Sequence, residues 1–191
     1  LVHDDLERAQ TCHRVLELLE FCQSHLGHEN RFIHAAMEAR APGTSQRLGH
    51  EHEEHERDIA RLAAGATALL SAGGERRDAL AYALYGELAV FVGHNHAHMH
   101  IEETEHNAVL WAHYSDAELA DIHGALVASI PPQENMLVMR WMVPFLPPAE
   151  RAALLADVQA HAPAPVLAAV LDVARPHLTQ MEWAKLERAL G

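Results

Sequence analysis

The sequence predicts an all-α protein, an up-down helical bundle followed by a C-terminal extension of short helices. Apolar residues make up 49% of the 191 residues and aromatic residues only 5%, and most of the apolar ones are the strong helix formers Ala and Leu. Apolar positions recur every three or four residues, and no stretch alternates as a half-buried strand would. Breaker clusters at residues 41–45 and 73–74 separate the long segments. We therefore expect a bundle over residues 1–114 and an extension over residues 115–191.

Three long helices are expected in the bundle. The first should span residues 4–40, with Asp4 or Asp5 as its N-terminal cap, the second residues 46–71, and the third residues 77–112. We expect Tyr82 and Tyr85 in the core of the bundle. Beyond Tyr114, prolines divide the chain into shorter helices, and we expect these to pack on the bundle through Leu137, Met139, Trp141, Met142 and Phe145.

The charge balance narrows the classes of partner. Lys and Arg total 14 against 27 for Asp and Glu, a formal net charge of −13, so neither nucleic acid nor an anionic membrane surface is expected as a partner, whereas a cation is. No run of about twenty apolar residues and no signal peptide is found. Cys12 and Cys22 are ten residues apart on one expected helix and cannot pair there, which favours a reducing cytoplasm. The sequence does not determine the oligomeric state, and a homo-oligomer is compatible with it.

Histidine is the most unusual feature of the composition. The chain has 17 histidines, and residues 94–106 contain five of them together with three glutamates. Imidazole and carboxylate groups bind first-row transition metals, and residues four apart share one face of a helix. His98 and Glu102 have this spacing, and His25 and Glu29 repeat it on the first helix. Two such pairs on facing helices predict a metal site in the bundle core.

The second helix offers His50, His52 and His55 as alternative ligands. We favour His52 because Ile59 and Leu62 continue its face seven and ten residues later. The other candidates for a ligand are His55, Glu56, His94 and His28. The remaining histidines are expected to be solvated, as isolated surface histidines usually are: His13, His34, His96, His100, His106, His113, His123, His161 and His177.

These residues resemble the hemerythrin-like family, the HHE cation-binding domains. The resemblance covers residues 4–120, rests on the two His-x-x-x-Glu pairs, and extends into Leu-Trp-Ala-His-Tyr-Ser-Asp-Ala-Glu-Leu at residues 110–119. It implies a four-helix bundle around a non-haem di-iron centre, with zinc or nickel as substitute metals. The ligands it implies here are His25, Glu29, His52, His98 and Glu102.

One part of the family pattern has no counterpart. The family's first helix supplies a histidine, whereas His3 lies 22 residues before His25, about 33 Å along the same helix. That separation is too long for a shared site. The first helix of the bundle is therefore expected to be missing from the chain.

The resemblance implies a protein that binds or senses O₂, NO, peroxide, iron or redox state. There are two alternatives: a di-iron peroxidase or NO-detoxifying enzyme that uses the same ligands, and a zinc- or nickel-binding regulatory module that uses the histidine-rich surface. Binding is favoured over catalysis because the sequence identifies neither a proton donor nor a substrate route. We predict no catalytic residue.

Overall fold

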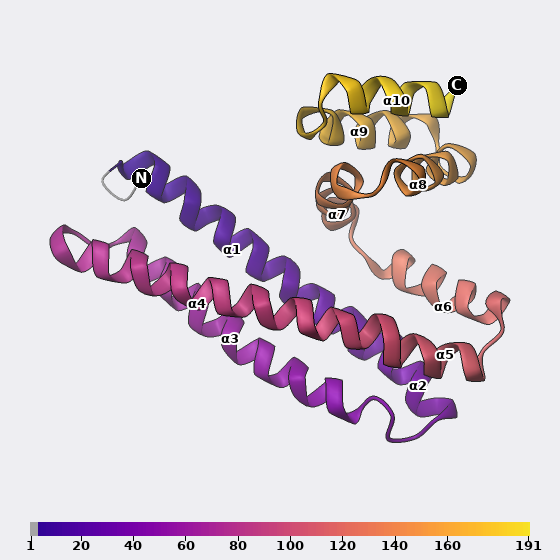
Figure 1. The fold of residues 1–191 in the computed structure, drawn as a ribbon, viewed down its shortest axis with the longest axis horizontal. Helices are drawn as coiled ribbons and strands as arrows, with labels where there is room; N and C mark the ends of the chain where they lie inside the picture. Colours follow the sequence, from indigo (N-terminus) through magenta and orange to yellow (C-terminus); the bar gives the residue numbers. More distant parts are fainter. Residues whose placement is uncertain (1–3) are drawn as a thin grey trace. The chain divides into compact units, whose positions relative to one another are not determined.

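The computed structural model describes residues 4–191, so His3 lies outside the described part. Within that part, helices joined by short turns and loops make up the chain, and there is no strand. The predicted all-α class is confirmed. The first expected helix consists of α1 (Asp5–His28), the π-helix η1 (Glu29–His34) and α2 (Ala35–Arg40). The second is α3 (Gln46–Leu70), and the third consists of α4 (Gly74–Ile101), the π-helix η2 (Glu102–His106) and α5 (Asn107–His113), as Figure 1 shows.

Local chemistry fixes both ends of the first helical segment. The Asp4 carboxylate accepts a hydrogen bond from the Glu7 N–H at 2.8 Å and caps α1. At the other end, the Glu38 carboxylate accepts from the Gly43 N–H (2.8 Å), the Ser45 N–H (3.1 Å) and the Ser45 hydroxyl (2.7 Å). Gly43 has a φ of +88°, which favours glycine. The Glu38 carboxylate therefore anchors the turn into α3 through three hydrogen bonds.

Consecutive long helices of the bundle run antiparallel to each other. Gln23 and Asn30 of the first segment bond to Glu56 and His52 of α3, so the partner number falls as the chain advances. The core between α1, α3 and α4 is apolar and consists of Cys12, Leu19, Leu26, Ile59, Leu62, Ala66, Leu69, Leu84 and Phe91. The helices thus form an up-down bundle with α3 packed against both α1 and α4.

The prediction that Tyr82 and Tyr85 are core residues is wrong. They are 81% and 73% exposed. The buried residues of α4 are Leu84, Phe91 and His98, each seven residues from the next, so this helix packs along one narrow stripe. The two tyrosines flank that stripe and face outward.

The chain divides into two compact units after Val127. The sequence suggests a division after Tyr114, but α6 (Asp116–Ser129) groups mainly with the first unit. One reason is Arg40, whose guanidinium lies 3.8 Å from the centre of the Tyr114 ring and forms an ion pair with Glu118. It also donates to the His113 carbonyl at 2.6 Å.

The second unit has its own core. Its elements are α7 (Pro132–Phe145), α8 (Pro148–His161), α9 (Ala164–Ala174), η3 (Arg175–His177) and α10 (Gln180–Leu190). They enclose Val143, Leu155, Val170, Ala174 and Leu186, with Met136 and Met139 packed alongside. Buried Arg151 donates to the carbonyls of Val143 (2.8 Å), Pro144 (2.7 Å) and Leu146 (3.0 Å) at the end of α7.

Among the described residues, none of the helices has the length and apolar character needed to cross a bilayer.

Candidate metal centre

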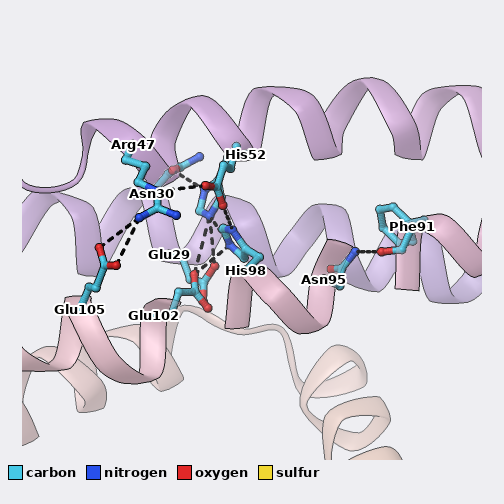
Figure 2. A network of polar contacts seen from close by, with 10 residues as sticks. Glu29, Asn30, Arg47, His52, Phe91, Asn95, His98, Glu102 and Glu105 are labelled. Carbon is cyan, nitrogen blue, oxygen red and sulfur yellow. Dashed lines mark hydrogen bonds and ion pairs between the residues drawn. The ribbon is translucent and has the colours of Figure 1, made fainter. Parts of the chain in front are cut away.

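Four side chains from the three helical segments of the bundle converge on one point. Glu29 and Glu102 are the first residues of η1 and η2, His98 lies in the last turn of α4, and His52 lies near the beginning of α3. One ligand atom from each lies within 4.8 Å of all the others. Figure 2 shows the two carboxylates beside the two imidazoles. The group can hold a metal ion.

The Nε2 atoms of the two imidazoles face each other, and neither is an obvious hydrogen-bond donor to the other. Nε2 of His52 lies 3.0 Å from Nε2 of His98. The other nitrogen of each ring is already bonded: Nδ1 of His98 to a carboxylate oxygen of Glu51 (3.1 Å), and Nδ1 of His52 to the amide oxygen of Asn30 (2.8 Å). Since those oxygens only accept, each Nδ1 must carry its proton, and a neutral ring then presents a lone pair at Nε2. Two facing lone pairs call for a shared proton or a cation.

The carboxylates add further acceptors at the same point. Glu102 Oε1 lies 3.0 Å from His98 Nε2 and 3.8 Å from His52 Nε2, while Glu29 Oε2 lies 3.6 Å from His52 Nε2. Glu29 Oε2 is buried and has no hydrogen-bond partner. An ion with bonds of about 2.1 Å separates neighbouring donors by about 3.0 Å in an octahedron and about 3.4 Å in a tetrahedron. The observed separations are close to these values, so the donor set fits a first-row transition metal.

The electrostatics of the centre reflect this crowding of donors and acceptors. Burial lowers the pKa of His98, but its hydrogen bonds to Glu102 and Glu51 outweigh burial and leave that pKa raised. Burial alone would raise the pKa of Glu102, whereas its bonds to His52 and His98 hold it well below the usual value. A proton on His98 therefore balances part of the carboxylate charge. A bound cation would replace that proton.

The other predicted ligands lie at the edge of the cluster or away from it. His25 is half-buried, and its Nε2 lies 3.1 Å from Glu29 Oε1, a contact that raises the pKa of His25. His55 is buried with its ring 4.8 Å from that of His98. Exposed Glu56 accepts a hydrogen bond from Gln23 instead. The remaining three lie outside the group of four: His50 and His94 are exposed and His28 is half-buried.

The prediction that His34 and His106 are solvated is wrong. They are 7% and 5% exposed, and the His34 ring lies 4.7 Å from that of His52 and 5.2 Å from that of His106. Burial, together with the neighbouring imidazoles of His52 and His106, lowers the pKa of His34 to about 4. The other histidines expected to be solvated are exposed: His13, His96, His100, His113, His123, His161 and His177.

Spacing alone would have suggested His106, which lies four residues after Glu102. No such signal exists for His34, because it lies five residues after Glu29 and only the π-helix η1 turns it inward. The sequence also does not predict the roles of Asn30 and Glu51. A residue that binds the Nδ1 atom of a histidine on another helix has no fixed spacing from that histidine in the sequence.

A cavity between α3 and α4 gives access to one side of the centre. Its volume is about 570 Å³, and it is open to solvent, with His98, His55 and Glu51 among its lining residues. Arg47, Arg57 and Arg61 also line it, but Glu51, Glu54 and Asp58 balance them. The cavity walls are therefore polar without a strong net charge.

We compared the chain with protein-family models, with curated proteins and with solved structures, and none of the three comparisons gave a match.

Proposed function

We propose that this chain is a non-haem iron protein of hemerythrin-like type that binds or senses a small ligand such as O₂, NO or peroxide. One observation carries the proposal. The buried Nε2 atoms of His52 and His98 and the half-buried carboxylates of Glu29 and Glu102 lie within 4.8 Å of one another and supply the ligand atoms of a transition-metal site.

Iron is favoured among the metals that such a group can bind. Mixed imidazole and carboxylate donors that leave positions open suit Fe(II), whereas structural zinc sites are closed and usually rich in cysteine. The free cysteines Cys12 and Cys22 are not among the converging residues. When bound, iron supplies reversible binding of a diatomic molecule or redox chemistry.

The chain's own residues orient the ligands and limit access. Glu51 and Asn30 fix the two imidazoles so that both Nε2 atoms face inward. The polar cavity beside His98 admits water and small molecules up to the Glu51–His98 pair. Phe91 packs edge-on against His55 at 5.9 Å and contributes to the apolar core. These features suit the binding of a small ligand.

The test is iron loading of the purified full chain in air, with near-ultraviolet absorption and metal content as readouts. We expect ligand-to-iron charge-transfer bands and stoichiometric iron in the wild type. His98→Ala should lose both, whereas His100→Ala, an exposed neighbour, should keep both.

Two results would contradict this proposal. One is a chain that takes up no iron, and the other is stoichiometric zinc with no iron after expression with both metals available. The second result would favour the alternative of a zinc-binding module.

A further inference from the structure

A small cavity lies between α8 and α10 of the second unit. Its volume is about 240 Å³, which is below the range of about 300–1,000 Å³ that is typical of sites for drug-sized ligands. Much of its wall is apolar and includes Ala149, Ala152, Leu186 and Ala189. Three charged residues also line it, Arg151, Glu182 and Lys185. Apolar walls with a few charged groups are the usual form of a small-molecule site.

Arg151 carries a buried positive charge whose ion pair is loose. Only 3% of the residue is exposed. Its Nε and Nη2 atoms donate to carbonyls at the end of α7, which are neutral acceptors. The Glu182 carboxylate lies 3.9 Å from Nη2, too far for a hydrogen bond. Since buried charges are normally paired at close range, the charge of this guanidinium is only partly compensated.

The free nitrogen of Arg151 is open to the cavity. Within residues 4–191, Nη1 forms no hydrogen bond, whereas Nε and Nη2 form three. Nη1 is also not among the completely buried polar atoms that lack a partner, so it keeps some contact with solvent. Because Arg151 lines the cavity, we infer that this contact is made there. An acceptor inside the cavity can therefore reach Nη1.

Glu182 is already engaged and does not fill this role. Its Oε2 accepts hydrogen bonds from the Thr179 N–H at 2.9 Å and from the Thr179 hydroxyl at 2.6 Å, which closes the capping box of α10. Lys185 follows three residues later on the same helix. The two cations of the cavity exceed its one carboxylate by one charge, although the chain as a whole carries a formal charge of −13. The cavity therefore favours a ligand with a single negative charge.

We propose that this cavity binds a small monocarboxylate with a short aliphatic chain. One carboxylate oxygen accepts from Nη1 of Arg151 and the other from the ammonium group of Lys185, while the aliphatic chain packs against Ala152 and Leu186. A phosphate group suits the cavity less well, because apolar walls would leave its further oxygens without donors. This inference does not depend on the proposed metal centre.

The test is a titration of the ¹⁵N-labelled, metal-free full chain with unbranched carboxylates from acetate to hexanoate, followed by NMR. The backbone amide signals of residues 148–152 and 182–189 should shift and reach saturation. The corresponding neutral amides, from acetamide to hexanamide, have a similar shape without the charge and should leave these signals unchanged. The metal-free chain is used because a bound metal ion can itself bind carboxylates.

Two variants test the cavity while they keep Arg151, which also holds the end of α7. Ala152→Leu places a larger side chain in the cavity and should abolish the saturable shifts, whereas Ala153→Leu, at an exposed position on the same helix, should bind like the wild type. Lys185→Gln should weaken binding about 2–5-fold. Arg188→Gln removes an exposed cation from the same helix outside the cavity and should not weaken it.

Three results would overturn the site. The first is a wild type in which no acid of the series gives saturable shifts at these residues, and the second is an equal response to the acids and the amides. The third is an Ala152→Leu variant that binds as tightly as the wild type. None of these results bears on the proposed metal centre, because the cavity belongs to the second unit.

Discussion

At the scale of single residues, the centre depends on side chains that would not themselves bind metal. Glu51 accepts a hydrogen bond from Nδ1 of His98 at 3.1 Å, and Asn30 does the same for His52 at 2.8 Å. Such partners select the tautomer and hold the ring in place, and their loss usually weakens metal binding by about 10–100-fold. The proposed ligands are thus only part of what determines affinity.

We expect Glu51→Ala to weaken Co²⁺ binding by about 10–100-fold while the fold is retained. Competition titration against a chelator of known affinity measures this change. Glu54→Ala is the matched control, because Glu54 is an exposed glutamate on the same helix and should leave affinity unchanged. Equal affinities for the two variants would show that Glu51 does not orient His98.

The buried His34 should make the metal-free protein sensitive to acid. In the unfolded chain its imidazole takes up a proton below a pKa of 6.5, whereas in the folded protein it does so only below about 4. Between these values the unfolded state binds more protons, so stability falls as the pH drops from about 6.5 to about 4. The shift corresponds to a contribution of up to about 3 kcal/mol.

Urea unfolding of the metal-free protein at pH 7, 5.5 and 4.5 measures this contribution, with His34→Leu as the comparison. We expect the wild type to lose more stability than the variant over this range. Since His25 and His98 have raised pKa values and act in the opposite direction, only the difference between the two proteins isolates His34. Parallel pH profiles would count against a buried, neutral His34.

At the scale of elements, the two π-helices set which residues face the core. An α-helix turns by about 100° per residue, so the wider turn at residues 29–34 changes the face presented by everything that follows. His34, the last residue of η1, and Met37 in α2 are both buried, with Met37 only 1% exposed. The π-helix therefore lets both Glu29, at its N-terminal end, and Met37, which follows it in the chain, face the core.

Deletion of Arg31 from η1 should remove the extra residue and rotate the following turns by about 100°. Met37 would leave the core, and loss of a buried methionine costs about 2–5 kcal/mol. We expect a lower thermal midpoint by circular dichroism and weaker Co²⁺ binding. The control Arg31→Ala keeps the length of the segment and should leave both nearly unchanged, since Arg31 is exposed. A deletion variant that matches the wild type in both measurements would show that the π-turn is dispensable.

At the scale of the whole molecule, the residues of the proposed metal centre belong to one unit. All residues assigned to it precede Val127, and the second unit has a separate core around Val143, Leu155 and Val170. Two cores of this kind are expected to fold independently.

A fragment of residues 1–127 should therefore bind Co²⁺ with the affinity and stoichiometry of the full chain. Titration of both proteins under the same conditions tests this expectation, with circular dichroism to establish that the fragment is helical. A folded fragment that no longer binds metal would show that the second unit takes part in forming the centre.

The sequence alone determined the all-α class and the approximate bounds of the long helices. It did so because helix propensity, apolar spacing and breaker residues act over a few neighbouring positions. Spacing also paired His25 with Glu29 and His98 with Glu102, since residues four apart share a face in any regular helix. It gave no sign of either π-helix, which departs from that regularity.

Only the tertiary structure decided which of the 17 histidines meet. It buries His34 and His106 and leaves Tyr82 and Tyr85 exposed, because burial depends on which stripe of a helix its neighbours cover. It also brings Asn30 and Glu51 to the outer nitrogens of His52 and His98. Apolar spacing shows that a helix has a buried face, but it does not show which other segment covers that face or in which register, and these decide the contacts between segments far apart in the chain.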